Sequence, residues 1–231
     1  MIGIIGAMND EVQGLKDIMK KKKVVEKAGM EFCSGELGGK DVVVVKCGIG
    51  KVNASICAQI LVDDYNIDAL INVGVAGSLN KDIDVCDIVI SKKAIQHDFS
   101  TGDTDNYEVG EIPEMGTKYF YADDLLIEKA TRCAQRLNLG IKVFEGIVAT
   151  GDQFINDEEK KDYLVEEFGA DCCEMEGASI AQVAHLNDVP FVILRSISDK
   201  ADGDAVMSFD KFMEIAANNS MLLVMAMVAA L

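Results

Sequence analysis

Two acidic residues, Glu176 and Asp199, have the sequence surroundings that most suggest chemistry. Both lie in residues 171–202, DCCEMEGASIAQVAHLNDVPFVILRSISDKAD, where a helix-like run follows Glu176 and an apolar strand over residues 190–197 delivers Ser198 and Asp199. Ligands of open α/β sheets bind outside the carboxyl ends of strands, so we expect both carboxylates to face one crevice. Such a pair indicates acid/base chemistry or recognition of sugar hydroxyls, whereas either residue alone is more often a solvated loop acid.

The composition favours one compact domain, residues 1–231, because the chain is 49% hydrophobic and contains only two prolines. Its formal net charge of -17 argues against nucleic acid or an anionic membrane as a partner. A small neutral or cationic ligand fits this charge better.

The seven cysteines form no CxxC pair, and no secretory leader precedes them, which predicts reduced thiols in a cytoplasmic protein. Only His97 and His185 could join them in a zinc site, and their spacing fits no such pattern. We therefore expect neither a metal nor a cofactor.

Alternating apolar runs predict an α/β fold. Predicted strands cover residues 2–5, 31–46, 69–73, 87–96, 141–150 and 190–197. Two helices are predicted over residues 51–65 and 123–137. Four more are predicted to begin near Asp10, with Asn9 as N-cap, at Asn156, after the EMEG motif, and at Ser208. The four lysines of residues 20–23 are predicted to end the first helix, where cations suit the helix dipole. The closing run MLLVMAMVAAL is shorter than a bilayer span and is predicted to belong to a packed helix.

Glycine-rich turns are predicted after three successive strands, at Gly6, at Gly48 and Gly50, and at GVAGSL after Val73. Backbone N–H groups in such turns can approach a ligand closely, so the turns are expected to rim one crevice. The GIGK segment lacks the GxxxxGK[ST] spacing of a phosphate-binding P-loop.

Six motifs occur in order along nearly the whole chain: GIIGAMNDEV, CGIGKVNA, NVGVAG, ATGDQFI, EMEGASIAQVA, and RSISDKAD with SFDKF. Together they resemble the nucleoside phosphorylase and nucleosidase superfamily, and within it most closely the 5′-methylthioadenosine/S-adenosylhomocysteine nucleosidases. The resemblance implies a three-layer α/β fold with a central mixed β-sheet flanked by helices, and a homodimer without a cofactor. It also implies hydrolysis of the N-glycosidic bond of 5′-thio-substituted adenosines, and of 5′-deoxyadenosine, in methionine salvage.

The same resemblance implies the residue roles. Asp199 would protonate N7 of the leaving adenine while Ser198 holds its carboxyl group, and Glu11 would deprotonate the attacking water, with Arg195 orienting the water or the carboxylates. Glu176 would bind the ribose 2′ and 3′ hydroxyls. The implied apolar contacts are Phe154 and Ile155 with the purine, Met175 with the sugar, and Met8, Ile49 and Phe209 with the alkylthio tail.

Simpler roles remain open for several of these residues. Arg195 is equally well interpreted as a structural counter-ion of Glu174 or Glu176, and Glu174 itself is interpreted as structural. The aliphatic residues Met8, Ile49 and Met175 fit an ordinary core by periodicity alone. His97, beside Asp98, is expected to be a hydrogen-bonded strand end, and His185 a surface or packing residue.

The acidic turn MNDEV would repel a phosphate dianion, which favours water over phosphate as the nucleophile. The alternatives are a futalosine-type nucleosidase, a nucleoside phosphorylase, and a nucleoside-binding protein without turnover. The chain departs from the family at Val75, where a serine is common, and in the loop 99–115. That loop commonly reaches a neighbouring subunit's 5′ pocket, and Tyr107 is the candidate contact.

Overall fold

The computed structural model describes residues 1–102, 107–137 and 140–231. Its strands are β1 (Ile2–Gly6), β2 (Lys20–Lys27), β3 (Met30–Leu37), β4 (Lys40–Lys46), β5 (Ala69–Ser78), β6 (Ile88–Gln96), β7 (Phe120–Tyr121), β8 (Val143–Thr150), β9 (Cys172–Glu174) and β10 (Phe191–Asp199). Its helices are α1 (Asn9–Ile18), α2 (Lys51–Tyr65), α3 (Asp124–Leu137), α4 (Glu158–Phe168), α5 (Gly177–Leu186) and α6 (Ala205–Ala230).

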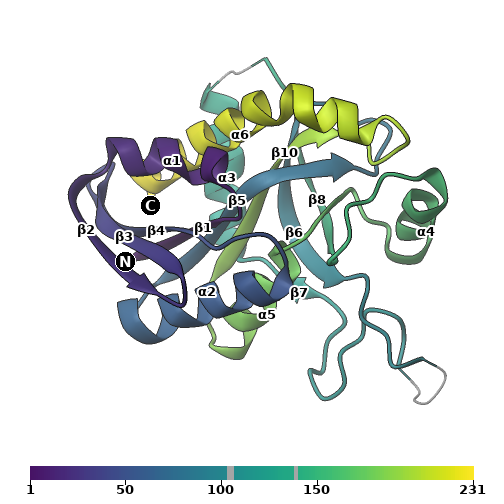
Figure 1. The fold of residues 1–231 in the computed structure, drawn as a ribbon, viewed down its shortest axis with the longest axis horizontal. Helices are drawn as coiled ribbons and strands as arrows, with labels where there is room; N and C mark the ends of the chain where they lie inside the picture. The colour runs from purple at the N-terminus through teal and green to yellow at the C-terminus, as the bar shows by residue number, and fades with distance from the viewer. Residues whose placement is uncertain (103–106, 138–139) are drawn as a thin grey trace.

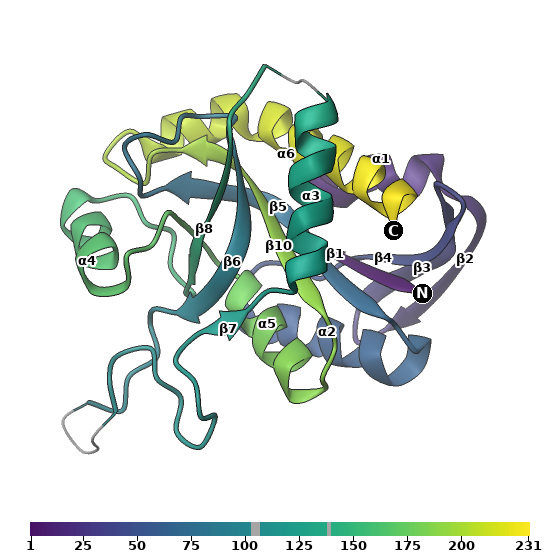
Figure 2. The ribbon, with the colours of Figure 1, turned by 180° about the vertical axis from the view of Figure 1, so that it is seen from behind.

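The strands form one mixed sheet in the order β10-β6-β8-β9-β5-β1-β4-β3-β2, with β7 paired to β6 (Figure 1). Because β5 also pairs with β10, five of the strands close into a barrel-like ring, while β1 to β4 extend from it as an open sheet. Helices α1, α3 and α6 cover one face, and α2 and α5 cover the other, as the opposite view also shows (Figure 2). The predicted three-layer α/β fold with a mixed sheet is confirmed.

Four neighbouring strands, β4, β1, β5 and β10, run parallel to one another. Their carboxyl ends therefore meet at one edge of the sheet, as predicted for a ligand crevice. The segments that leave this edge contain Met8 after β1 and Gly50 after β4, and Asp199 ends β10. The α/β topology thus brings together side chains that are far apart in the sequence.

The lysine run was predicted wrongly as the end of the first helix. Helix α1 stops at Ile18, and residues 20–27 form the exposed edge strand β2, which pairs only with β3 among the described residues. The reason is that Met19 is buried with an extended backbone and turns the chain out of the helix.

The predicted turn at GVAGSL is also wrong, since β5 continues through it to Ser78. The strand is held there by β10 on one side and by β9 on the other. Gly74 and Gly77 instead allow close packing, because a Cβ atom would lie 1.9 Å from Nη1 of Arg195 at the first and 2.8 Å from Oδ1 of Asp199 at the second. By contrast, the turn at Gly48 and Gly50 is confirmed, with φ of 87° and 99°.

Helix starts differ from the predictions by a few residues. Met8 rather than Asn9 is the N-cap of α1, and Asp157 caps α4. Helix α6 begins at Ala205 and, as predicted, packs on β10, β5, α1 and α3. By length and composition alone its residues 208–230 would suffice to cross a membrane, a property that core helices share. All seven cysteines are free thiols, and all but Cys86 are buried.

Candidate active site

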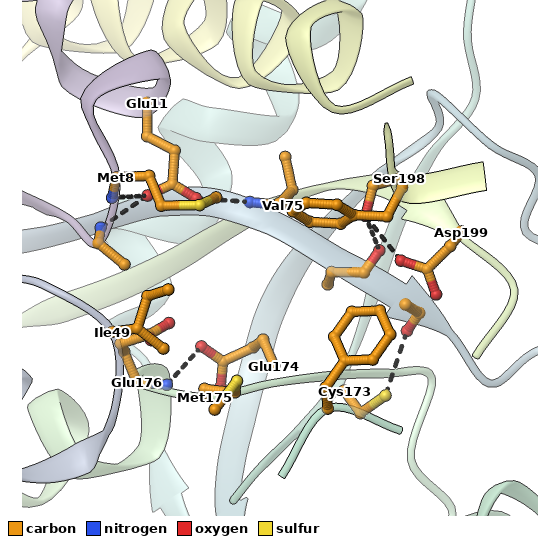
Figure 3. Close-up of a pocket in the computed structure, with 15 residues that line it drawn as sticks. Met8, Glu11, Ile49, Val75, Cys173, Glu174, Met175, Glu176, Ser198 and Asp199 are labelled. Carbon is orange, nitrogen blue, oxygen red and sulfur yellow. Dashed lines mark hydrogen bonds between the residues drawn. The ribbon is translucent and has the colours of Figure 1, made fainter. Parts of the chain in front are cut away.

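A cavity of about 520 Å³, counting its open mouth, lies at the sheet edge where the parallel strands end (Figure 3). A smaller cavity of about 240 Å³ shares part of its wall and is completed by Gln153 and Ile155. The larger cavity is lined by Ala7, Met8, Glu11, Ile49, Val75, Ala76, Gly77, Phe154, Cys173, Glu174, Met175, Glu176, Ser198, Asp199 and Phe209.

All the site residues predicted from the sequence, except Arg195, line one or both cavities. In particular, Glu11 and Asp199 share the larger cavity, which lies between the end of β1 and the end of β10. Arg195 lies fully buried behind the carboxylates. This placement agrees with the counter-ion interpretation of Arg195.

The buried Glu11 carboxylate is fixed by the backbone. Oε2 accepts hydrogen bonds from the N–H groups of Ala7 (2.6 Å) and Met8 (2.9 Å), and Oε1 accepts one from Val75 (3.2 Å). Oε1 keeps a lone pair with which it can accept a proton from a ligand or a water. Burial raises the pKa of Glu11, opposed by Arg195 and by these three backbone groups, so the carboxyl group is more basic than an exposed one.

Arg195 neutralises a cluster of buried acids. Its Nη2 donates to Glu174 and to Oδ1 of Asn72 (2.6 Å), and lies 3.7 Å from Oε2 of Glu176. Burial alone would lower the pKa of Arg195, but Glu174, Glu176 and Glu11 raise it, so the guanidinium stays charged. Glu174 in turn accepts the backbone N–H groups of Glu176 (3.0 Å) and Gly177 (2.7 Å), which supports its predicted structural role.

Glu176 faces the larger cavity from the N-cap position of α5. Its Oε1 accepts a hydrogen bond from the backbone N–H of Gly50 at 2.9 Å. Burial raises its pKa to about 7, with repulsion from Glu174 in the same direction and attraction to Arg195 opposed to it. A carboxylate buried beside a positive charge, with lone pairs left on its oxygens, is suited to bind hydroxyl groups.

Asp199, at the β10 end of the larger cavity, is held by hydrogen bonds from residues next to it in the sequence. Its Oδ2 accepts the hydroxyl of Ser198 (2.8 Å), and its Oδ1 accepts the backbone N–H of Ala201 (2.9 Å). Burial raises the pKa of Asp199 although both hydrogen bonds oppose the rise. The predicted role of Ser198 as a holder of this carboxyl group agrees with the contact.

The remaining walls are apolar. Phe154 and Phe209 meet edge to face with ring centroids 5.9 Å apart, and Phe154 and Ile49 are 45% and 54% exposed, which leaves apolar surface for a ligand. Val75 packs with Ala216 and Ala217 of α6, so an aliphatic contact replaces the hydroxyl that a serine would supply.

The sequence reasoning missed Cys173 as a lining residue of both cavities. Its thiol lies 3.7 Å from the carbonyl oxygen of Gly77 and is buried, with a raised pKa caused first by burial and then by Asp199. Its position just before the EMEG motif could have indicated this location.

Three other predicted residues lie outside the cavities. His97 directly follows β6, and its backbone N–H donates to the carbonyl oxygen of Thr150 (2.9 Å), which confirms the expected hydrogen-bonded strand end. Neither nitrogen of the His97 ring has a hydrogen-bond partner among the described residues. Burial lowers its pKa to about 4, so the ring is neutral. His185 is exposed and packs on Phe120, as expected. Tyr107 is 38% exposed, and residues 103–106 of the predicted loop lie outside the described residues.

The raised pKa of Glu176 predicts a pH-dependent stability. Between its ordinary value of 4.5 and about 7, the folded protein holds a proton that the unfolded chain has released, so the free energy of unfolding falls as pH rises through this window. The fall is on the order of 3 kcal/mol. In Glu176→Gln we expect a clearly smaller fall between pH 4.5 and 7.5 in urea unfolding. The exposed control Glu166→Gln should keep the wild-type fall; an unchanged fall in Glu176→Gln would contradict the assignment.

Comparisons with known proteins agree with this geometry. The model of the phosphorylase superfamily matches residues 1–229. The 5′-methylthioadenosine/S-adenosylhomocysteine nucleosidase of Shewanella pealeana is 42% identical over all of this chain and 99% of its own length.

Two solved structures are also similar over the whole chain. The nucleosidase of the same name from Neisseria meningitidis, in complex with methylthio-immucillin-A, has a TM-score of 0.96, 36% identity and 99% of its own chain covered. The futalosine hydrolase of Helicobacter pylori has a TM-score of 0.94, 35% identity and 97% covered. The chain therefore belongs to the phosphorylase superfamily, in the branch whose curated relatives carry the name 5′-methylthioadenosine/S-adenosylhomocysteine nucleosidase.

Proposed function

We propose that this protein hydrolyses the N-glycosidic bond of 5′-methylthioadenosine and S-adenosylhomocysteine, releasing adenine and a 5-thio-substituted ribose, in methionine salvage. The observation that carries the proposal is the placement of Glu11 and Asp199 on the wall of one cavity. The names of the relatives supply the substrates. In this proposal 5′-deoxyadenosine is a further substrate, and residues 1–231 act as one domain without a cofactor.

Asp199 acts as the general acid. Its raised pKa increases the protonated fraction, and it lines the smaller cavity together with Phe154 and Ile155, which in this proposal contact the purine. Proton transfer to N7 of the purine draws electrons from the glycosidic bond and makes adenine a better leaving group. Ser198 and the backbone N–H of Ala201 fix the direction of the transfer.

Glu176 and Glu11 act on the sugar and the water. Glu176 accepts hydrogen bonds from the ribose hydroxyls, and its negative charge stabilises the positive charge that develops on the sugar as the bond breaks. Glu11 takes a proton from the attacking water through its incompletely used Oε1. Arg195 does not touch substrate in this scheme; it positions the carboxylates.

Water is the nucleophile rather than phosphate. Among the described residues no lysine or arginine lines either cavity, and Arg195 is already paired with Glu174. A phosphate dianion would therefore meet the carboxylates of Glu11 and Glu176 without a cation to neutralise it.

A homodimer in the cytoplasm completes the proposal. Three apolar side chains at the start of α2 and just before it are exposed: Ile49, which also lines the larger cavity, Val52 and Ile56. Burial against a second copy would remove this surface from water. The seven free thiols suit a reducing compartment.

The reaction is tested by product analysis in phosphate-free buffer. We expect the purified protein to release adenine from 5′-methylthioadenosine and S-adenosylhomocysteine, with a rate unchanged when phosphate is added. Futalosine and inosine serve as competing substrates. Release of base from futalosine alone would replace the proposed substrate, and no release from any nucleoside would refute the enzyme activity.

Asp199→Asn tests the general acid. The amide preserves the shape of the side chain but cannot donate an acidic proton, so kcat should fall by roughly 10²-fold to 10⁴-fold. Steady-state adenine release measures the effect. Asp162→Asn, exposed on α4 and outside both cavities, is the matched control and should keep wild-type turnover. Equal turnover in Asp199→Asn and the control would exclude the acid role.

The dimer is tested by sedimentation. We expect the wild type to sediment at twice the mass of one chain, and Val52→Asp to shift it toward the monomer because a charge would be buried in the interface. The exposed control Leu186→Asp, on α5, should remain dimeric. A monomeric wild type would contradict the proposal.

A further inference from the structure

Three polar side chains outside both cavities form a closed ring of hydrogen bonds. Asp152 accepts the backbone N–H of Lys51 (2.8 Å), Asp98 accepts the backbone N–H of Asp152 (2.9 Å), and Nζ of Lys51 donates to Asp98 (2.5 Å). The ring joins three elements: the start of α2, the segment after β6 and the segment after β8. Nothing in the proposed reaction uses these side chains.

The ring connects the two segments that line the sugar and base ends of the site. Next to Lys51, the backbone N–H of Gly50 donates to Glu176, so the same turn offers one N–H to the sugar-binding carboxylate and the next to the ring. Asp152 is followed directly by Gln153, Phe154 and Ile155, which line the smaller cavity. The consecutive N–H groups of Gly50 and Lys51 thus link Glu176 to Asp152, and through Asp152 to the segment 153–155.

The contact between Gly50 and Asp152 is close. Gly50 has a φ of 99°, and a Cβ atom there would lie 3.0 Å from Oδ1 of Asp152. The aspartate therefore rests directly against the turn that presents the N–H to Glu176. A shift of Asp152 would let this turn move, and with it the hydrogen bond to the carboxylate.

The charged pair of the ring is largely shielded from water. The side chains of Lys51 and Asp98 are 19% and 15% exposed, and Nζ of Lys51 also donates to Oε1 of Gln96 (3.2 Å). Burial raises the pKa of Asp98, but the hydrogen bonds from Lys51 and from the backbone N–H of Asp152 outweigh this effect. The pKa of Asp98 is therefore lower than its ordinary value, and the carboxyl group is ionised. An ionised, shielded acceptor with two strong donors holds its partners in one geometry.

We propose that Lys51, Asp98 and Asp152 are positioning residues that set the separation between the ribose-binding Glu176 and the base-binding segment 153–155. This inference rests on the proposed nucleoside hydrolysis. Alignment of the sugar and the base matters most in the transition state, when the glycosidic bond is half broken and proton donor and carboxylate must act together. Loss of the ring should therefore lower kcat more than it raises KM.

The test compares Asp152→Ala with Asp152→Asn. The alanine removes the acceptor for the Lys51 N–H, whereas the asparagine keeps an oxygen in that place. With 5′-methylthioadenosine we expect kcat of Asp152→Ala to fall about 10-fold or more with KM changed less than about 3-fold. Asp152→Asn should recover most of kcat. Asp64→Ala, which breaks an exposed ion pair at the far end of the same helix, is the matched control and should keep wild-type values.

A double-mutant cycle separates positioning from general stability. If the three residues act as one unit, kcat of Asp98→Ala/Asp152→Ala should lie close to that of the poorer single variant rather than at the product of both losses. A kcat of Asp152→Ala within 2-fold of wild type, failure of Asp152→Asn to recover kcat, or independent losses in the cycle would each overturn the proposal.

Failure of the reaction itself would be visible in the wild type. If wild-type protein released no adenine, the proposed hydrolysis would fail, and the ring would be tested by calorimetry on the same variants with an adenosine analogue whose ribose ring carries a positive charge, as the sugar does in the transition state. Binding weakened about 10-fold or more in Asp152→Ala and recovered in Asp152→Asn would then support the ring. Equal affinity in all variants, or no measurable binding by the wild type, would overturn it.

Discussion

One buried guanidinium holds the site together. Three carboxylates, those of Glu11, Glu174 and Glu176, surround Arg195 behind the cavity, and without that charge their mutual repulsion and the cost of burial would neutralise them. Burial is the main reason why the pKa values of Glu11 and Glu176 stay above their ordinary values, because the attraction to the one cation offsets its effect only in part. In the proposed reaction, the same negative charge would repel a phosphate dianion and so favour water as the nucleophile.

The barrel-like closure of the sheet explains how this cluster is assembled. Arg195 lies in β10, and its guanidinium reaches Gly74 in the adjacent β5, where the missing side chain leaves room for it. Strand β9 then ends at Glu174, directly beside this pair. The chemistry therefore depends on the pairing of β5 with both β10 and β9, which an open sheet in simple chain order would not provide.

Much of this site was predictable because its residues follow strong local patterns. The run of valines before Gly48 and the apolar strand before Asp199 mark strand ends unambiguously, and the motif resemblance then assigned roles to the residues there. The errors arose where tertiary contacts decide. Four lysines have no strong strand preference, yet pairing with β3 makes them a strand, and the glycines after Val73 resemble a turn although they serve close packing. No local signal shows that Asp98 and Asp152 share a ring with Lys51, because their contact depends on how three distant segments meet.

The edge strand β2 has a consequence for how copies of this protein can meet. Its outer backbone groups are unpaired among the described residues, and unpaired edges invite a strand from another molecule. Here every residue of the strand is exposed, its first four residues are all lysines, and the register with β3 shifts between Lys20 and Lys23. Two such edges carry like charges and are distorted by the register shift, which disfavours pairing of this strand with the same strand of a second molecule.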